Sequence, residues 1–125
     1  MEFSFERLLI WQKSRSIVKE VYKIASMFPP HEKYGLSDQI RRAAISVSSN
    51  IAEGTGRFSM KEKIHFCEIA YGSLMEAMCQ LILAVDLEMI PRNKVDEIRP
   101  LFEELSRQLS AYRRSCLLYT SPSPR

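Results

Sequence analysis

The residues of this chain that could do chemistry lie close together, between Glu62 and Cys67. Glu62 and His65 have the Glu-x-x-His spacing that places two metal ligands on one helix face in di-iron bundles. That chemistry needs a second such pair, and the other histidine, His31, lies beside Pro30 in a connecting segment. Cys67 and His65 could form a nucleophile and its base, but residues two apart on a helix point in different directions. We therefore expect no metal, no cofactor and no catalytic residue.

A second candidate for chemistry is the Gly54-x-Gly56 spacing, which phosphate-binding loops also contain. A phosphate loop follows a strand and continues into Gly-Lys-Ser or Gly-Lys-Thr. Neither feature is present around Gly54. We interpret the segment as a tight connector between two helices.

Composition favours a soluble, all-helical domain. The 125 residues are 46% apolar and 26% charged, which suits one domain with a single core. No run approaches the roughly 18 to 20 apolar residues of a membrane span, and the first fifteen residues lack the pattern of a secretory signal. We expect a cytoplasmic protein that does not enter a membrane. The net charge of +3 is too small to demand a polyanionic partner.

The last ten residues, 116–125 (CLLYTSPSPR), differ abruptly in composition from the helical segment before them. This string resembles the translation of a sequencing adaptor read through as coding sequence. We predict that it is a non-native tail and that residues 1–115 hold the fold. Two cysteines then remain, Cys67 and Cys79, about 18 Å apart along one predicted helix. They are too distant to pair, so we expect reduced thiols.

Four helices are predicted from their boundaries and their apolar spacing. Ser37 is a competent N-cap for the second helix, which stops at Gly54. Ser59 and Glu62 form a capping box at the start of the third. Pro100 should kink the fourth helix or separate its first residues as a short turn. The predicted helices are residues 6–26, 38–53, 60–89 and 92–114.

The third predicted helix has the clearest apolar seam, with steps of four and three. Its members are Met60, Ile64, Cys67, Tyr71, Leu74, Met78, Leu81 and Val85. With short connections and no internal repeat, this pattern predicts an antiparallel up-and-down four-helix bundle.

The same helix has more apolar residues than one seam needs. Those outside the seam are Phe66, Ile69, Ala70, Ala77, Ile82 and Leu83. A monomeric bundle would not require them, so part of this surface is expected to meet another copy of the chain. Gly72 in mid-helix is best explained by the close approach of a neighbouring helix. We expect Phe66, Ile69 and Gly72 to pack in a homo-oligomer.

A polar stripe runs along the second helix beside its apolar face. It contains Gln39, Arg42, Ser46, Ser49, Asn50 and Glu53. One interpretation is structural: the small serines let another helix pack closely, and the larger side chains form hydrogen bonds that set the register. Glu53 supports it, because a carboxylate at the helix end needs a compensating cation such as Arg57.

The other interpretation is that part of this region faces solvent and binds a polyanion. The basic residues there are Arg41, Arg42, Arg57, Lys61 and Lys63. Five charges are modest, but in a closed ring of identical subunits the patch would repeat and phosphate contacts would add. Acids in the same stretch oppose this interpretation.

Four segments together resemble a known family. They are WQK at residues 11–13, FPPHEKYGL at 28–36, QIRRAAISVSSNIAEG at 39–54 and IAYGSLME at 69–76. The chain resembles small four-helix-bundle proteins of bacteria, some encoded in intervening sequences of large-subunit ribosomal RNA genes. It is also similar to the accessory protein of diversity-generating retroelements, which assists a reverse transcriptase. The resemblance covers about residues 3–114, and Pro100 departs from it.

The resemblance implies an up-and-down bundle, ring-like and often pentameric homo-oligomers, and no known catalytic activity. In the retroelement branch it also implies binding to nucleic acid and to the polymerase. Two hypotheses follow. The chain is either a non-enzymatic scaffold or accessory protein that self-assembles, or a direct RNA or DNA binder whose basic patch is its working surface.

Overall fold

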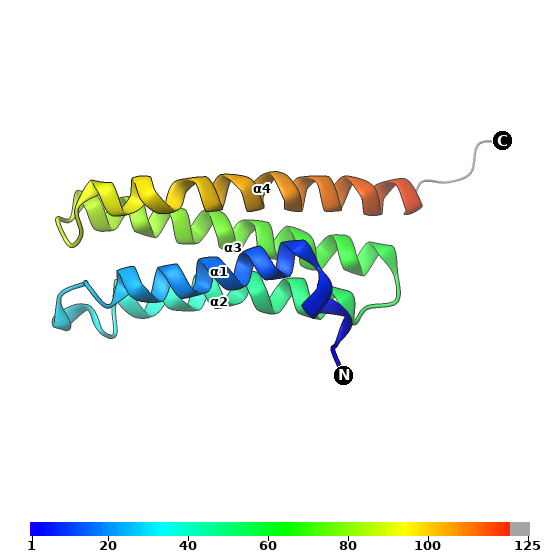
Figure 1. Cartoon of the computed structure of the whole chain (residues 1–125), viewed down its shortest axis with the longest axis horizontal. Helices are drawn as coiled ribbons and strands as arrows, with labels where there is room; N and C mark the ends of the chain where they lie inside the picture. The colour runs from blue at the N-terminus through cyan, green and yellow to red at the C-terminus, as the bar shows by residue number, and fades with distance from the viewer. Residues whose placement is uncertain (121–125) are drawn as a thin grey trace.

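A computed structural model describes residues 1–120 as an all-α, antiparallel up-and-down four-helix bundle (Figure 1). The long helices are α1 (Leu9–Ala25), α2 (Leu36–Thr55), α3 (Met60–Asp86) and α4 (Arg92–Thr120). Two short 3-10 turns, Ser4–Arg7 and Pro30–Glu32, precede α1 and α2. The connections lie at alternate ends of the bundle, so each helix runs opposite to the one before it. The predicted fold class is therefore confirmed.

The start of α2 differs from the prediction. Ser37 is not the N-cap; it lies inside the first turn and is only 3% exposed. Gly35 holds the N-cap position, and a Glu32 carboxylate oxygen accepts a hydrogen bond from the Leu36 backbone N–H at 3.0 Å. A Cβ on Gly35 would lie 2.8 Å from that oxygen, so a side chain there would displace the cap. A carboxylate four residues before the helix replaces the usual N-cap hydroxyl.

The predicted N-cap Ser59 of α3 is confirmed, but the Glu62 side chain does not complete the capping box, and the helix ends earlier than predicted. The Ser59 hydroxyl oxygen accepts a hydrogen bond from the Glu62 backbone N–H at 3.1 Å. At the other end, Glu88 has a φ of 59°, in the left-handed region, and the Met89 N–H donates to the Ala84 carbonyl at 2.8 Å. This is the Schellman arrangement that closes a helix, usually with glycine at the left-handed position.

The fourth helix is continuous through Pro100, so the expected separate turn before it is wrong. Pro100 and Asp96 both lie on the exposed side of α4, where water can hydrogen-bond the carbonyl that proline leaves free. The helix also continues beyond residue 114 to Thr120, and Cys116 is buried. The first part of the segment predicted to be a tail is therefore helical, while residues 121–125 lie outside the described residues.

The core is centred on α3, whose fully or nearly buried residues alternate between large and small. The apolar ones are Cys67, Ala70, Leu74, Ala77, Leu81 and Ala84, and Gln80 is the buried polar residue of this helix. Leu74 and Leu81 are buried as the predicted seam requires, but the prediction is wrong for Tyr71, which is exposed. Ala70 and Ala77, expected on the outer face, are buried because their small side chains let the neighbouring helices approach closely.

Replacing Leu74 by Ala should lower the free energy of unfolding by about 2 to 5 kcal/mol, because the side chain is fully buried and would leave a cavity. Leu9→Ala makes the same chemical change at a site that is 55% exposed. We expect it to have little effect. Urea denaturation monitored by circular dichroism measures both changes. Equal losses of unfolding free energy in the two variants would contradict the placement of Leu74 in the core.

Replacing Glu88 by Gly should raise the free energy of unfolding by about 0.5 to 1 kcal/mol, because glycine adopts a positive φ without steric cost. Glu103→Gly is the matched control. It places glycine inside α4, where it should instead lower stability by about 1 kcal/mol. Thermal denaturation measures both variants. A lower melting temperature in both would be evidence against backbone strain at Glu88.

Candidate interaction surfaces

The centre of the polar stripe on α2 faces α3 and is occupied by hydrogen bonds within the chain. The Ser46 and Ser73 hydroxyl oxygens are 2.8 Å apart and join the two helices. The Asn50 side-chain amide donates to the Ser46 carbonyl at 2.8 Å and to the Ser46 hydroxyl at 3.0 Å. These contacts agree with the structural interpretation of Ser46 and Asn50. Ser73 was not identified from the sequence, because a lone serine on an apolar helix gives no signal.

The stripe continues at Gln39, which meets a buried residue that the sequence analysis missed. The amide of Gln80, only 6% exposed, donates to the Gln39 side-chain oxygen and to a Glu76 carboxylate oxygen, each at 3.4 Å. The Gln80 side-chain oxygen has no hydrogen-bond partner in the described chain. A glutamine between Ala77 and Leu81 in a core seam is the sequence signal that could have identified this contact.

Glu53, at the end of the stripe, lies beside a cation, as expected for a carboxylate at the negative end of a helix dipole. An Arg57 guanidinium nitrogen is 3.7 Å from a Glu53 carboxylate oxygen. The Arg57 guanidinium also lies over the Phe66 ring, 4.7 Å from its centroid. The Glu53 side chain is about half exposed, so this ion pair contributes little to stability.

The basic residues proposed as a nucleic-acid patch mostly have partners in the chain. Arg42 forms a 2.9 Å ion pair with Asp38, and Lys63 donates to the carbonyls of Gly54 and Thr55 at 3.3 and 3.4 Å. Arg41 stacks on Tyr22 of α1, with 5.4 Å from its guanidinium carbon to the ring centroid. The exposed Lys61 has no partner among the described residues. Arg41 therefore lies against α1, while Lys63 caps the carbonyl groups at the C-terminal end of α2.

The residues considered for catalysis show no activated group. The Cys67 thiol is buried and contacts the Leu109 carbonyl at 3.4 Å. Burial, with a smaller contribution from Cys116, raises the pKa of Cys67 to about 11, so the reactive thiolate is disfavoured at neutral pH. His65 is exposed and packs edge-on against Phe66. Within residues 1–120 no group of three His, Cys, Asp or Glu side chains could hold a metal ion.

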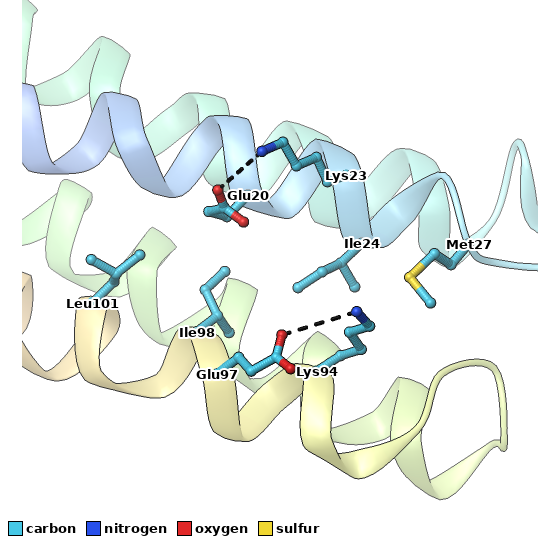
Figure 2. Close-up of a pocket in the computed structure, with 8 residues that line it drawn as sticks. All are labelled: Glu20, Lys23, Ile24, Met27, Lys94, Glu97, Ile98 and Leu101. Carbon is cyan, nitrogen blue, oxygen red and sulfur yellow. Dashed lines mark hydrogen bonds and ion pairs between the residues drawn. The ribbon is translucent and has the colours of Figure 1, made fainter.

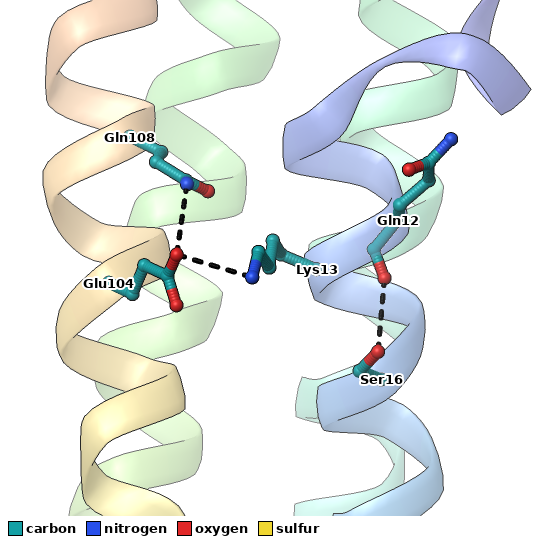
Figure 3. Close-up of polar contacts among 5 residues, drawn as sticks. All are labelled: Gln12, Lys13, Ser16, Glu104 and Gln108. Atoms are coloured by element: carbon teal, nitrogen blue, oxygen red, sulfur yellow. Dashed lines mark hydrogen bonds and ion pairs between the residues drawn. The ribbon is translucent and has the colours of Figure 1, made fainter.

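Ion pairs lie along the α1–α4 side of the bundle. Lys13 of α1 forms a 3.2 Å ion pair with Glu104, which also accepts a hydrogen bond from Gln108 (Figure 3). Farther along, a groove of about 210 Å³ lies between the same helices (Figure 2). Its two lysines each pair with a glutamate of their own helix, Lys23 with Glu20 and Lys94 with Glu97. The groove is electrically balanced and shows no preference for a charged ligand.

A second apolar row on α3 lies mostly outside the core, with Met78 at its border. Tyr71, Met75, Met78 and Ile82 follow each other at steps of four, three and four, which places them along one side of the helix. Three of them are about 40% exposed, and Met78 is half-buried. We call this row the outer stripe. On the outer face beside it, Ile69 and Leu83 are also exposed.

The three residues expected to pack between copies differ in their surroundings. Ile69 is exposed on the outer face. At Gly72 an added Cβ would meet nothing within 4 Å, so no helix of the same chain approaches it. Phe66, in contrast, is half-buried against Arg57 and Gly54. Ile69 and Gly72 remain available to a partner, whereas Phe66 packs mainly within its own chain.

Replacing Lys63 by Met should lower the free energy of unfolding by about 0.5 to 1 kcal/mol, because its ammonium group satisfies carbonyls at the negative end of the α2 dipole. Lys61→Met removes the same charge from an exposed position two residues away. We expect that variant to unfold like the wild type in thermal denaturation. A larger loss in the Lys61 variant would show that the Lys63 contacts are unimportant.

Comparisons with known proteins agree with this architecture. The fold is similar to the crystal structure of a protein of unknown function from the S23 ribosomal protein family of Bacteroides thetaiotaomicron. The TM-score is 0.78 at 22% identity, and the match covers 85% of this chain and 96% of that one. No curated protein sequence matches the chain. Residues 6–111 match the model of the 23S rRNA-intervening sequence protein family, and the chain therefore belongs to that family.

Proposed function

We propose that this chain is a non-enzymatic scaffold or accessory protein of the cytoplasm that assembles into a homo-oligomer through the outer face of α3. The observation that carries the proposal is the outer stripe together with Gly72. Apolar residues there lie in helical register, and no part of the same chain covers Gly72. A second helix could bury the stripe and approach the Gly72 backbone closely.

The composition of α3 supports this proposal. It is the one helix in the described part of the chain that is long and apolar enough to cross a membrane, with a mean hydropathy of 1.3 over 18 residues. One third of these 18 residues is buried within the bundle, because one side of α3 forms part of the core. A helix that is apolar on both sides fits a bundle that packs against further copies. The resemblance noted from the sequence favours a ring-like pentamer.

Direct binding of RNA or DNA is the second candidate, and the contacts of the proposed patch favour it less. Asp38 offsets Arg42, Glu53 offsets Arg57, and Lys63 is engaged with backbone carbonyls. An accessory role beside a reverse transcriptase therefore rests on the sequence resemblance rather than on a continuous basic surface. A salt-sensitive affinity that falls in an Arg42→Glu/Lys61→Glu variant would favour nucleic-acid binding.

Light scattering tests the assembly. We expect a mass several times the 14.5 kDa of one chain at micromolar concentration. Ile82→Glu should dissociate the oligomer, because it places a charge in the outer stripe. Ile45→Glu is the matched control: Ile45 of α2 is 43% exposed and Ile82 40%, but Ile45 lies outside the stripe.

The Ile45 variant should keep the wild-type mass, and both variants should keep their helical circular dichroism. A wild-type protein that is monomeric at all concentrations would contradict the proposal. So would an Ile82 variant that stays fully assembled.

A further inference from the structure

A groove of about 320 Å³ lies where the end of α1, the following connector and the first turns of α2 meet. Its polar lining consists of Ser26, Lys33, Ser37 and Arg41, beside the apolar Phe28. It lies at the end of the bundle where α1 is joined to α2 (Figure 1). No acidic residue lines it.

The two cations of this groove have no carboxylate partner in residues 1–120. Both contact aromatic rings: the Lys33 ammonium lies 5.4 Å from the Tyr34 centroid, and Arg41 stacks on Tyr22. The acids of the same segment are engaged elsewhere. Glu32 accepts a hydrogen bond from the backbone N–H of Leu36. Two unneutralised positive charges therefore border the groove, in contrast to the balanced groove between α1 and α4.

Asp38, which follows in the first turn of α2, pairs with Arg42 at 2.9 Å. It therefore does not neutralise Arg41. The groove also borders the start of α2, where the helix dipole contributes a partial positive charge. Charge and dipole both favour an anion.

The Ser37 hydroxyl adds a third polar group to the groove. Ser37 is only 3% exposed, and its hydroxyl makes no hydrogen bond within the described chain. The hydroxyl keeps some access to solvent, because in the described chain the unpaired side-chain oxygens that are sealed from solvent are those of Gln80 and Gln108. Ser37 lines the groove, so its hydroxyl is available as a donor to a ligand bound there. By contrast, the Ser26 hydroxyl donates to the Lys23 carbonyl at 2.6 Å.

We propose that this groove binds a phosphate group, with the Ser37 hydroxyl, the Lys33 ammonium and the Arg41 guanidinium as donors. The ionised oxygens of a phosphate group accept hydrogen bonds. The groove offers three donor side chains and no carboxylate that would repel the phosphate. The paired donors of arginine suit two phosphate oxygens at once. The group could belong to a small phosphate compound or to a nucleic-acid backbone. The proposal does not depend on assembly, because the groove is formed by α1 and α2 and the outer stripe by α3.

Isothermal titration calorimetry of the full chain with inorganic phosphate, at constant ionic strength, tests the site. We expect saturable binding that weakens about tenfold or more in a Lys33→Gln/Arg41→Gln variant, since both charge-assisted contacts are lost. Ser37→Ala should weaken binding less but measurably, with both charges kept. The matched control is Arg107→Gln/Arg114→Gln, which removes the same number of positive charges from exposed positions that have no ion pair in the described chain.

Binding in the control should stay within about twofold of the wild type, as expected for distant surface charges. No saturable binding by the wild type, or equal losses in the control, would overturn the proposal. Circular dichroism of each variant checks folding. If the double variant unfolds because Arg41 no longer stacks on Tyr22, Ser37→Ala still decides the matter, since unchanged binding there would contradict a donor role.

An RNA oligonucleotide without terminal phosphates distinguishes the two sources of the group. If inorganic phosphate displaces the RNA, and the Lys33/Arg41 variant loses both ligands, the site takes a backbone phosphate. If inorganic phosphate binds and the RNA does not, the site takes a small phosphate compound. Either result supports the phosphate site, whereas binding of both probes that is unaffected by the variant would overturn it.

Discussion

The close packing of α3 against α2 is the constraint on which the rest of the bundle depends. These two helices make the most extensive contact in the molecule. Alternation of Leu and Ala on α3 makes this possible: Leu74 and Leu81 fill the core, while Ala70, Ala77 and Ala84 let the backbones approach. Burial of apolar side chains is the dominant favourable term in folding, and burying this row of α3 fixes which of its other residues face outward.

Polar contacts across the same interface restrict the register rather than supply stability. Ser46 and Ser73 meet at a small-residue position where the helices are close, and Gln39 meets Gln80 about two turns away. Hydrogen bonds of this kind contribute about 1 kcal/mol each, but a sliding of the helices would leave buried groups unpaired. The α1–α4 side is different. It has the sparsest contact of the adjacent helix pairs and is joined by the exposed Lys13–Glu104 pair.

The distribution of charge separates basic residues that serve the fold from those that remain available. Lys63 and Arg57 belong to the turn between α2 and α3, where they neutralise carbonyl oxygens and Glu53. Lys33 and Arg41 lie at the opposite end of α2, where no acid offsets them. Basic residues close together in the sequence therefore have different roles. Lys33, in the connector before α2, and Arg41, in the second turn of α2, are two of the basic residues that no acid offsets in the described chain.

The sequence by itself determined the helical class, the four segments and the antiparallel order, because apolar periodicity and local capping depend on neighbouring residues only. The Ser59 cap is an example, since its partner Glu62 is three residues away. The tertiary structure alone decided which apolar row of α3 is buried. Two adjacent rows, one through Tyr71 and one through Ala70, have compatible periodicity, and the choice depends on the volume that α2 and α4 leave free.

The same distinction holds for the candidate sites. The polar stripe could be listed from its spacing, but its partners Ser73 and Gln80 come from another helix and were not foreseen. The basic residues could be counted, yet only their positions in space showed that Arg42 pairs with an acid and Lys63 with carbonyl oxygens, while Arg41 stacks on a ring and keeps its charge unneutralised. A sequence records the charge of a side chain. Whether that charge is neutralised depends on atoms brought near it by folding.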